Sequence, residues 1–151
     1  MTDGEAARTE HIDIPTRYVV IAIAASLGGL IVHNLADFPP SILLAPETIV
    51  PVVITVVLGL AMVRWSSSTV FFIAGTWAVI VIVVGGASVL PLSIWPFEPA
   101  QTLSHYGVHV VYAAAQLPLL WVAVRGYRIE RARHQQVDDT TTRQGPDAKP
   151  R

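Results

Sequence analysis

The stretch TVFFIAGTWAVIVIVVGGASVL, residues 69–90, decides the class of this protein. It contains no Asp, Glu, Lys or Arg. It is also long enough for a helix that crosses a hydrocarbon core of about 30 Å, which takes about 20 residues. Residues 18–36, 48–63 and 99–124 are equally free of these charged residues. The sequence therefore predicts four transmembrane helices, at residues 18–37, 47–65, 69–90 and 104–125.

The composition of the whole chain points the same way. Of its 151 residues, 52% are hydrophobic and 14% are charged, against roughly 25% charged in an average soluble domain. The fold class that we predict is an all-α integral membrane protein, a four-helix transmembrane bundle. A formal net charge of -1 provides no basic field for nucleic acid. With no cysteine, disulfides, thiolate metal sites and iron–sulfur clusters are excluded.

The basic residues predict the orientation, because cytoplasmic segments retain Lys and Arg. Arg8 and Arg17 precede the first predicted helix, and Arg64 lies in the second connection. The remaining seven of the ten basic residues follow residue 124. All ten lie on one side of a four-span bundle. We therefore expect a multi-pass protein of the plasma membrane with both termini in the cytoplasm.

Three segments follow from this topology. Residues 17–127 form the predicted transmembrane domain. Residues 1–16 and 128–151 are polar, and we expect both to be disordered cytoplasmic tails. The two outer connections, residues 38–46 and 91–97, are apolar and rich in proline, which predicts that they lie along the membrane interface.

Small residues are expected to bring the helices together, since association in lipid depends on close packing and on a few polar contacts. On the first helix, Ala24 with Gly28 and Ala25 with Gly29 form two small-xxx-small faces. Pro118 removes one backbone donor from the fourth helix and is predicted to bend it.

Polar residues form stripes on two of the predicted helices. On the fourth helix, offsets of four, seven and eleven residues place the members of one stripe on a single face. They are His105, His109, Tyr112 and Gln116. On the first helix, His33 and Asp37 are four residues apart. Because these two helices run antiparallel, His33 is expected to lie level with His109 if the helices are neighbours.

These stripes predict a pocket that opens to the outer side and suits a metal ion. The candidate ligands are His33, Asp37, His105 and His109, with Glu98 nearby on a loop. Neutral imidazole and carboxylate suit a divalent transition metal such as Zn, Cu, Ni or Fe. In the last turn of a helix, the Asp37 carboxylate faces the negative end of the helix dipole, an arrangement that a cation would relieve. Glu47 is interpreted only as an acid in a first helical turn.

Two alternatives stay open. One is a structural or accessory subunit that binds no ligand and whose polar stripe contacts another membrane protein. The other is a b-type haem protein with two of His33, His105 and His109 as axial ligands. Besides the lipid bilayer, the partners considered are a second copy of the chain or another membrane subunit. The sequence contains no His-Glu-x-x-His, Gly-x-Ser-x-Gly or phosphate-binding loop, and so gives no positive sign of an enzyme.

Overall fold

The computed structural model describes residues 14–90 and 102–143, and all regular structure within these ranges is helical. The elements are α1 (Thr16–Asp37), the 3-10 helix η1 (Pro40–Leu44), α2 (Pro46–Trp65), α3 (Ser68–Ile80), the π-helix η2 (Val81–Gly85), α4 (Leu103–Ala115) and α5 (Leu117–Arg143). Four helical segments are long and apolar enough to cross a membrane, as predicted. They are Thr16–Ala36, Pro46–Trp65, Ser68–Gly85 and Leu103–Asp139.

Local signals explain where the helices begin. Pro46 occupies the first turn of α2, where its missing N–H has no intrahelical role. The Ser67 side chain caps α3 by accepting a hydrogen bond from the Val70 backbone N–H. Thr102 caps α4 in the same way, with the His105 N–H as donor. The Thr102 cap sets the start of α4 and therefore the position of His105 and His109 along the helix.

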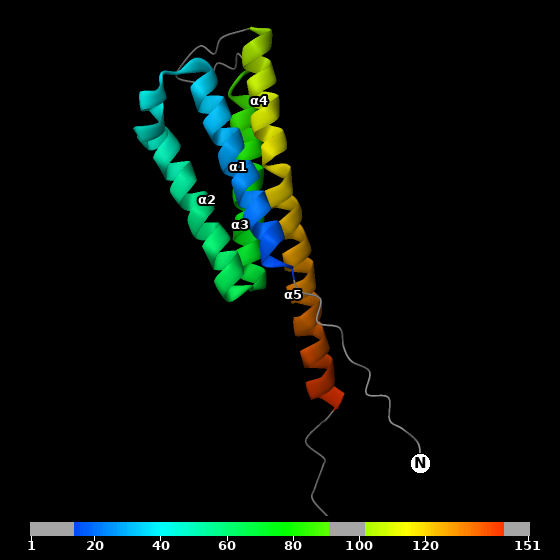
Figure 1. The fold of residues 1–151 in the computed structure, drawn as a ribbon. Coiled ribbons are helices and arrows are strands. Elements are labelled where there is room, and N and C mark those ends of the chain that lie inside the picture. The colour runs from blue at the N-terminus through cyan, green and yellow to red at the C-terminus, as the bar shows by residue number, and fades with distance from the viewer. Residues whose placement is uncertain (1–13, 91–101, 144–151) are drawn as a thin grey trace, which may run out of the picture.

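The helices form an up-and-down bundle in which α1 is central (Figure 1). α1 contacts α2, α4 and α5, whereas α3 packs against α2 and α5. The predicted neighbourhood of the first and fourth spans is therefore confirmed. α4 and α5 follow one another along a single span. The helix is interrupted at Gln116, two residues before Pro118.

Small side chains make the main core. Ala22 of α1, Ala74 and Ala78 of α3, and Ala123 of α5 are all 0% exposed. Phe71 fits over Gly126, where an added Cβ would overlap its ring. This close fit of small side chains packs α3 on α5, and it is the kind of contact that would hold helices together in a lipid bilayer.

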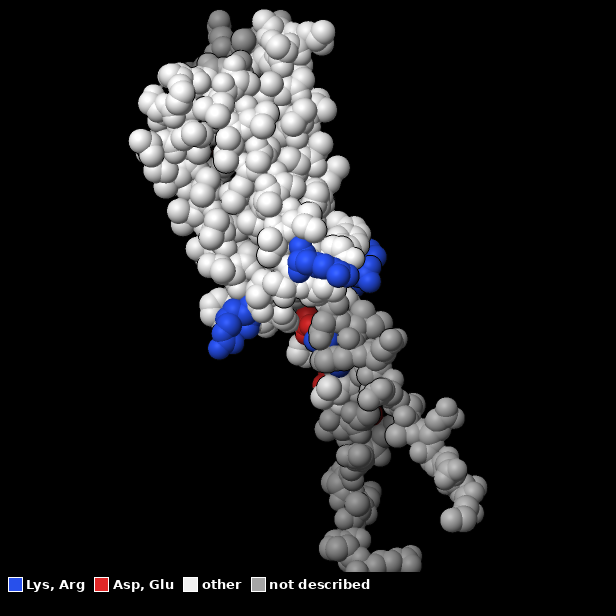
Figure 2. Space-filling view, viewed as in Figure 1, with Lys and Arg blue, Asp and Glu red and all other residues white. Residues whose placement is uncertain are grey.

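The outer surface of the four spans is apolar. Large hydrophobic side chains stay exposed along them, including Val20 at 58%, Leu60 at 65% and Val110 at 67%. Such a surface is compatible with contact with a lipid bilayer. On the face seen in Figure 2, the Lys and Arg side chains gather at the lower end, where α5 leaves the bundle.

The structure corrects the boundary of the C-terminal tail. We expected residues 128–151 to be disordered, but α5 continues to Arg143. The segment is rich in Arg, Glu and Gln, which are good helix formers. It also extends an existing helix, so it needs no new nucleus. Glu130 and Arg133 add an ion pair along it, with 2.6 Å between Oε1 and Nη1. Residues 144–151 and 1–13 lie outside the described ranges.

The outer connection after α1 is compact, because η1 packs on both α1 and α2. The second outer connection, residues 91–97, lies outside the described residues. Glu47 occupies the first turn of α2 and is exposed, in agreement with its interpretation as a helix-end acid.

Only one of the two predicted small-residue faces of α1 packs. An added Cβ at Gly29 would overlap the Cβ of Ala115 on α4, so Gly29 allows the two backbones to approach closely. The prediction for Ala24 and Gly28 is wrong. Ala24 is exposed, and a Cβ at Gly28 would meet nothing within 4 Å.

This difference provides a matched pair of variants. We expect Gly29→Ala to separate α1 from α4 and to destabilise the protein by about 1–3 kcal/mol, the usual cost of overpacking. Gly28→Ala should stay within about 1 kcal/mol of the wild type, because it changes only helix propensity. Unfolding in detergent, followed by circular dichroism, measures both. Equal stability of the two variants would contradict the proposed close contact.

Candidate functional site

His33 and His109 meet near the end of the bundle that is remote from the arginines. Their Nε2 atoms are 3.3 Å apart, and their rings lie edge to face with centroids 4.5 Å apart. His109 is 5% exposed, and His33 is partly buried. This contact confirms the prediction that the two histidines face one another across α1 and α4.

The other ring nitrogen of His109 points at α3. Its Nδ1 lies 2.5 Å from the carbonyl oxygen of Gly85, the last residue of the π-helix η2. The same carbonyl oxygen accepts a hydrogen bond from the Ser88 hydroxyl at 2.9 Å. Gly85 is needed here, because an added Cβ would come 2.6 Å from Cε1 of Tyr112.

His33 is held from the opposite side by a chain of side-chain hydrogen bonds. Its Nδ1 lies 3.0 Å from Oδ1 of Asn34. The Asn34 amide nitrogen donates to Thr48 Oγ1 at 2.6 Å, and that hydroxyl donates to the carbonyl of Ile42 at 2.8 Å. Because Thr48 donates to Ile42, it can only accept from Asn34. The Asn34 amide is therefore oriented with its oxygen toward His33.

These contacts define the protonation of the pair. The atoms facing both Nδ1 positions, Asn34 Oδ1 and the Gly85 carbonyl oxygen, are acceptors, so each Nδ1 carries a proton and donates. In a neutral imidazole the second nitrogen then carries a lone pair. Two lone pairs consequently face each other across 3.3 Å. Such an arrangement is repulsive unless a proton or a cation lies between the two nitrogens.

The structure brings together only part of the predicted ligand set. The ring of His105 lies against that of His109, with centroids 4.7 Å apart. Asp37 is the last residue of α1, but its side chain is outside the described part of the chain, and so is Glu98. Within the described ranges, no group of three His, Asp or Glu side chains is arranged to hold a metal ion.

The remaining members of the stripe are buried within the bundle. Tyr112, 7% exposed, has its ring centroid 4.8 Å from that of His33. Gln116, 1% exposed, accepts a hydrogen bond from the Ser26 hydroxyl at 2.7 Å and donates to the Ser26 carbonyl at 3.5 Å. These members of the stripe therefore join α4 to α1 inside one chain.

Sequence reasoning missed two groups of this site, the carbonyl of Gly85 and the hydroxyl of Thr48. It also missed the hydrogen bond that joins α3 to α2, from Trp77 Nε1 to Thr55 Oγ1 at 3.0 Å. In the sequence, the Gly85-Gly86 pair indicates close helix packing only. Nothing in the sequence indicates that the helix would shift to π geometry before Gly85, although such shifts are frequent at functional sites.

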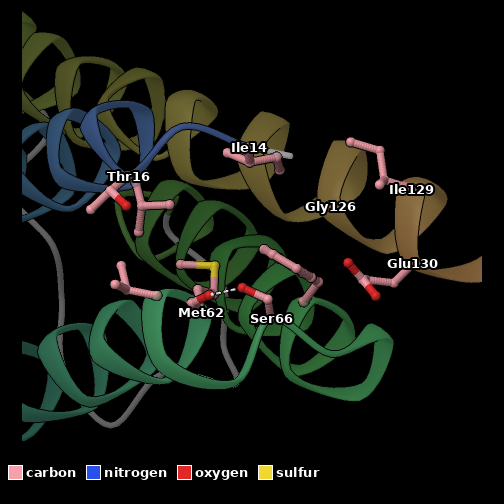
Figure 3. Close-up of a pocket in the computed structure, with 10 residues that line it drawn as sticks. Ile14, Thr16, Met62, Ser66, Gly126, Ile129 and Glu130 are labelled. Atoms are coloured by element: carbon pink, nitrogen blue, oxygen red, sulfur yellow. Dashed lines mark hydrogen bonds between the residues drawn. The ribbon is translucent and has the colours of Figure 1, made fainter. Parts of the chain in front are cut away.

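A separate cavity lies at the opposite end of the bundle (Figure 3). It has a volume of about 380 Å³ and is lined mainly by apolar side chains from α1, α2, α3 and α5. Among the described residues that line it, Glu130 is the one charged residue, and its carboxylate is paired with Arg133. None of these described residues is a histidine, and the cavity is separate from the His33–His109 site.

Comparison with known proteins produced no match, whether to a family model, to a curated protein or to a solved structure.

The Ser26–Gln116 bond should stabilise the contact of α1 with α4. In a double-mutant cycle with Ser26→Ala and Gln116→Leu, we expect a coupling energy of about 0.6 kcal/mol and at most about 1.7 kcal/mol, the range of interhelical hydrogen bonds in membranes. Thr76→Ala is the control, since the Thr76 hydroxyl bonds within its own helix to Phe72. Zero coupling between positions 26 and 116, measured by unfolding in detergent, would refute the bond.

Proposed function

We propose that this chain is a four-span protein of the plasma membrane, with both termini in the cytoplasm, that binds a divalent transition metal ion at the His33–His109 pair. The pair lies at the end of the bundle opposite to Arg17 and Arg64, and so on the outer side in this topology. The observation that carries the metal proposal is the pair of Nε2 atoms at 3.3 Å, both with lone pairs.

The separation of the two nitrogens fits two ligands of one ion. Zn–N bonds are about 2.0–2.1 Å long, so two nitrogens on a tetrahedral ion are about 3.3–3.4 Å apart. The same separation is long for a direct hydrogen bond, for which about 2.7–3.2 Å is usual. The edge-to-face contact of the rings means that a small rotation of one ring must accompany binding.

The Nδ1 contacts support the same assignment. Imidazoles that bind a metal through one nitrogen almost always donate the other N–H to a carbonyl or a carboxylate, which fixes the ring and its tautomer. Asn34 and Gly85 supply such acceptors here. Both act as positioning residues. Asn34 orients the His33 ring and is itself held by Thr48 of α2 and Ile42 of η1, and Gly85, at the end of η2, orients the His109 ring.

His105 and Asp37 are the proposed further ligands. His105 is next to His109 on α4, and Asp37 is one turn beyond His33 on α1. An ion between the imidazoles would also neutralise an acid at the negative end of the α1 dipole. Histidine with carboxylate favours Zn, Cu, Ni or Fe over the hard cations Mg and Ca.

The haem alternative is less favoured by this arrangement. Two axial imidazoles must stand on opposite faces of the macrocycle, whereas the rings of His33 and His109 are in direct contact. The alternative without a ligand rests on a specific observation, the buried interhelical bonds from Ser26 and Asn34. In that case the two histidines would share a proton and serve only to hold α1 to α4.

Single cysteines introduced into this cysteine-free chain test the topology. Ser41→Cys in η1 should react with a membrane-impermeant thiol reagent in intact cells, because η1 is assigned to the outer side. Thr69→Cys, at the start of α3, and His134→Cys, in α5, should react only after permeabilisation. All three native side chains are exposed. Labelling of positions 69 and 134 but not 41 in intact cells would reverse the assignment.

Replacement of one histidine tests the metal site. Protein stripped with a chelator and reloaded with Zn²⁺ should retain about one ion per chain, whereas His109→Ala should lose most of the affinity because it removes a ligand. Glu47→Gln is the matched control, since this exposed acid at the same end of the bundle should not affect binding. Metal analysis gives the stoichiometry, and calorimetry gives the affinity.

Acidification is a second arm of this experiment. A protonated imidazole has no lone pair for a metal. Binding should therefore weaken as the pH is lowered below the range in which histidine ordinarily titrates, about pH 6.5, and should recover on return to neutral pH. If the wild-type protein binds none of Zn²⁺, Cu²⁺, Ni²⁺ or Fe²⁺, only the alternative in which the chain binds no ligand would remain. Equal binding by wild type and His109→Ala would place any metal elsewhere.

A further inference from the structure

Two adjoining grooves lie at the arginine end of the bundle, far from the histidines. One, of about 250 Å³, lies between the start of α1 and α5, and the other, of about 420 Å³, runs along α5. The two share Trp121 and Arg125. Their other lining residues are Ile14, Pro15 and Tyr18 in the first and Val124, Arg128 and Ile129 in the second. Among the described residues, the lining of both is basic, aromatic and aliphatic, with no carboxylate.

Aromatic rings hold two guanidinium groups at this place. Cζ of Arg125 lies 5.4 Å from the Trp121 ring centroid, and Cζ of Arg17 lies 5.1 Å from that of Tyr18. The two rings meet edge to face at 6.0 Å. A guanidinium stacked on a ring keeps its N–H edge free for an anion.

No carboxylate neutralises these arginines in the described part of the chain. The ion pair found there joins Glu130 to Arg133, further along α5. Arg125 and Arg128 are both exposed. The groove along α5 therefore presents the positive charges of Arg125 and Arg128 beside an apolar wall of Trp121, Val124 and Ile129.

We propose that these grooves bind an anionic phospholipid of the leaflet on the arginine side. Arg125 and Arg128 would bond the headgroup phosphate, and the wall formed by Val124 and Ile129 would contact the acyl chains. Basic pockets beside transmembrane helices at the cytoplasmic side have this chemistry, and Trp and Tyr favour the headgroup level. A free phosphate would satisfy the arginines but would leave the apolar wall without a ligand. The proposal rests on the membrane insertion proposed above and is independent of the metal.

The full chain in a neutral detergent provides the test. We expect phosphatidylglycerol to raise the unfolding temperature saturably and far more than phosphatidylcholine does. In Arg125→Gln/Arg128→Gln, its affinity should fall roughly 30-fold, about fivefold for each lost charge. Arg128→Gln alone should lose about fivefold and serves if the double variant does not fold, because the Arg128 side chain is exposed. Arg64→Gln is the matched control, an exposed arginine at the same end of the bundle but outside both grooves.

Several results would overturn the proposal. Equal stabilisation by phosphatidylcholine would remove the role of charge. An equal effect of inorganic phosphate would indicate an ion site rather than a lipid site, and equal losses in Arg64→Gln and Arg128→Gln would indicate a diffuse field. The thiol-labelling experiment tests membrane insertion separately, and Zn²⁺ content tests the histidine pair, so the failure of one proposal is distinguishable from the failure of another.

Discussion

The close contact of α1 with α4 is the constraint on which the rest of this structure depends. Gly29 lets α1 approach the Cβ of Ala115 and the backbone of Tyr112 on α4. That approach places Ser26 within reach of Gln116, and His33 within reach of His109. In a bilayer the bare helices gain nothing from excluding water, so such contacts must stabilise the pairing. The absence of a side chain at Gly29 thus allows both the packing of α1 on α4 and the geometry of the candidate site.

The candidate metal site combines groups with different origins in the fold. The histidines come from helices that are adjacent because of small residues. Their Nδ1 partners are the carbonyl of Gly85, at the end of η2, and the side-chain oxygen of Asn34, which lies beside His33 on α1. The Gly85 carbonyl, at the end of η2, faces His109, and the Asn34 amide is oriented because the Thr48 hydroxyl donates to Ile42. The two irregular parts of the bundle therefore orient the two imidazoles.

The two ends of the bundle differ in chemistry. One end carries imidazoles among buried polar side chains, and its proposed ligand is a cation. The other carries stacked arginines at the edge of the apolar belt, and its proposed ligand is an anionic headgroup. Between them, the core of alanine side chains with Met62 and Leu119 contains no titratable group among the described core residues. In the membrane topology proposed above, this separation agrees with the high cost of charge at the centre of a bilayer.

The sequence alone determined the four apolar spans, the gathering of arginine at one end and the level match of His33 with His109, because these depend only on composition, chain direction and helical rise. Tertiary structure decided which face of each helix packs inward. Gly29 rather than Gly28 meets α4, and both residues are equally small. A helix apolar on all sides does not specify its own rotation in lipid. The Nδ1 partners of the histidines depend on that rotation and on the π-helix, and so only the folded bundle defines them.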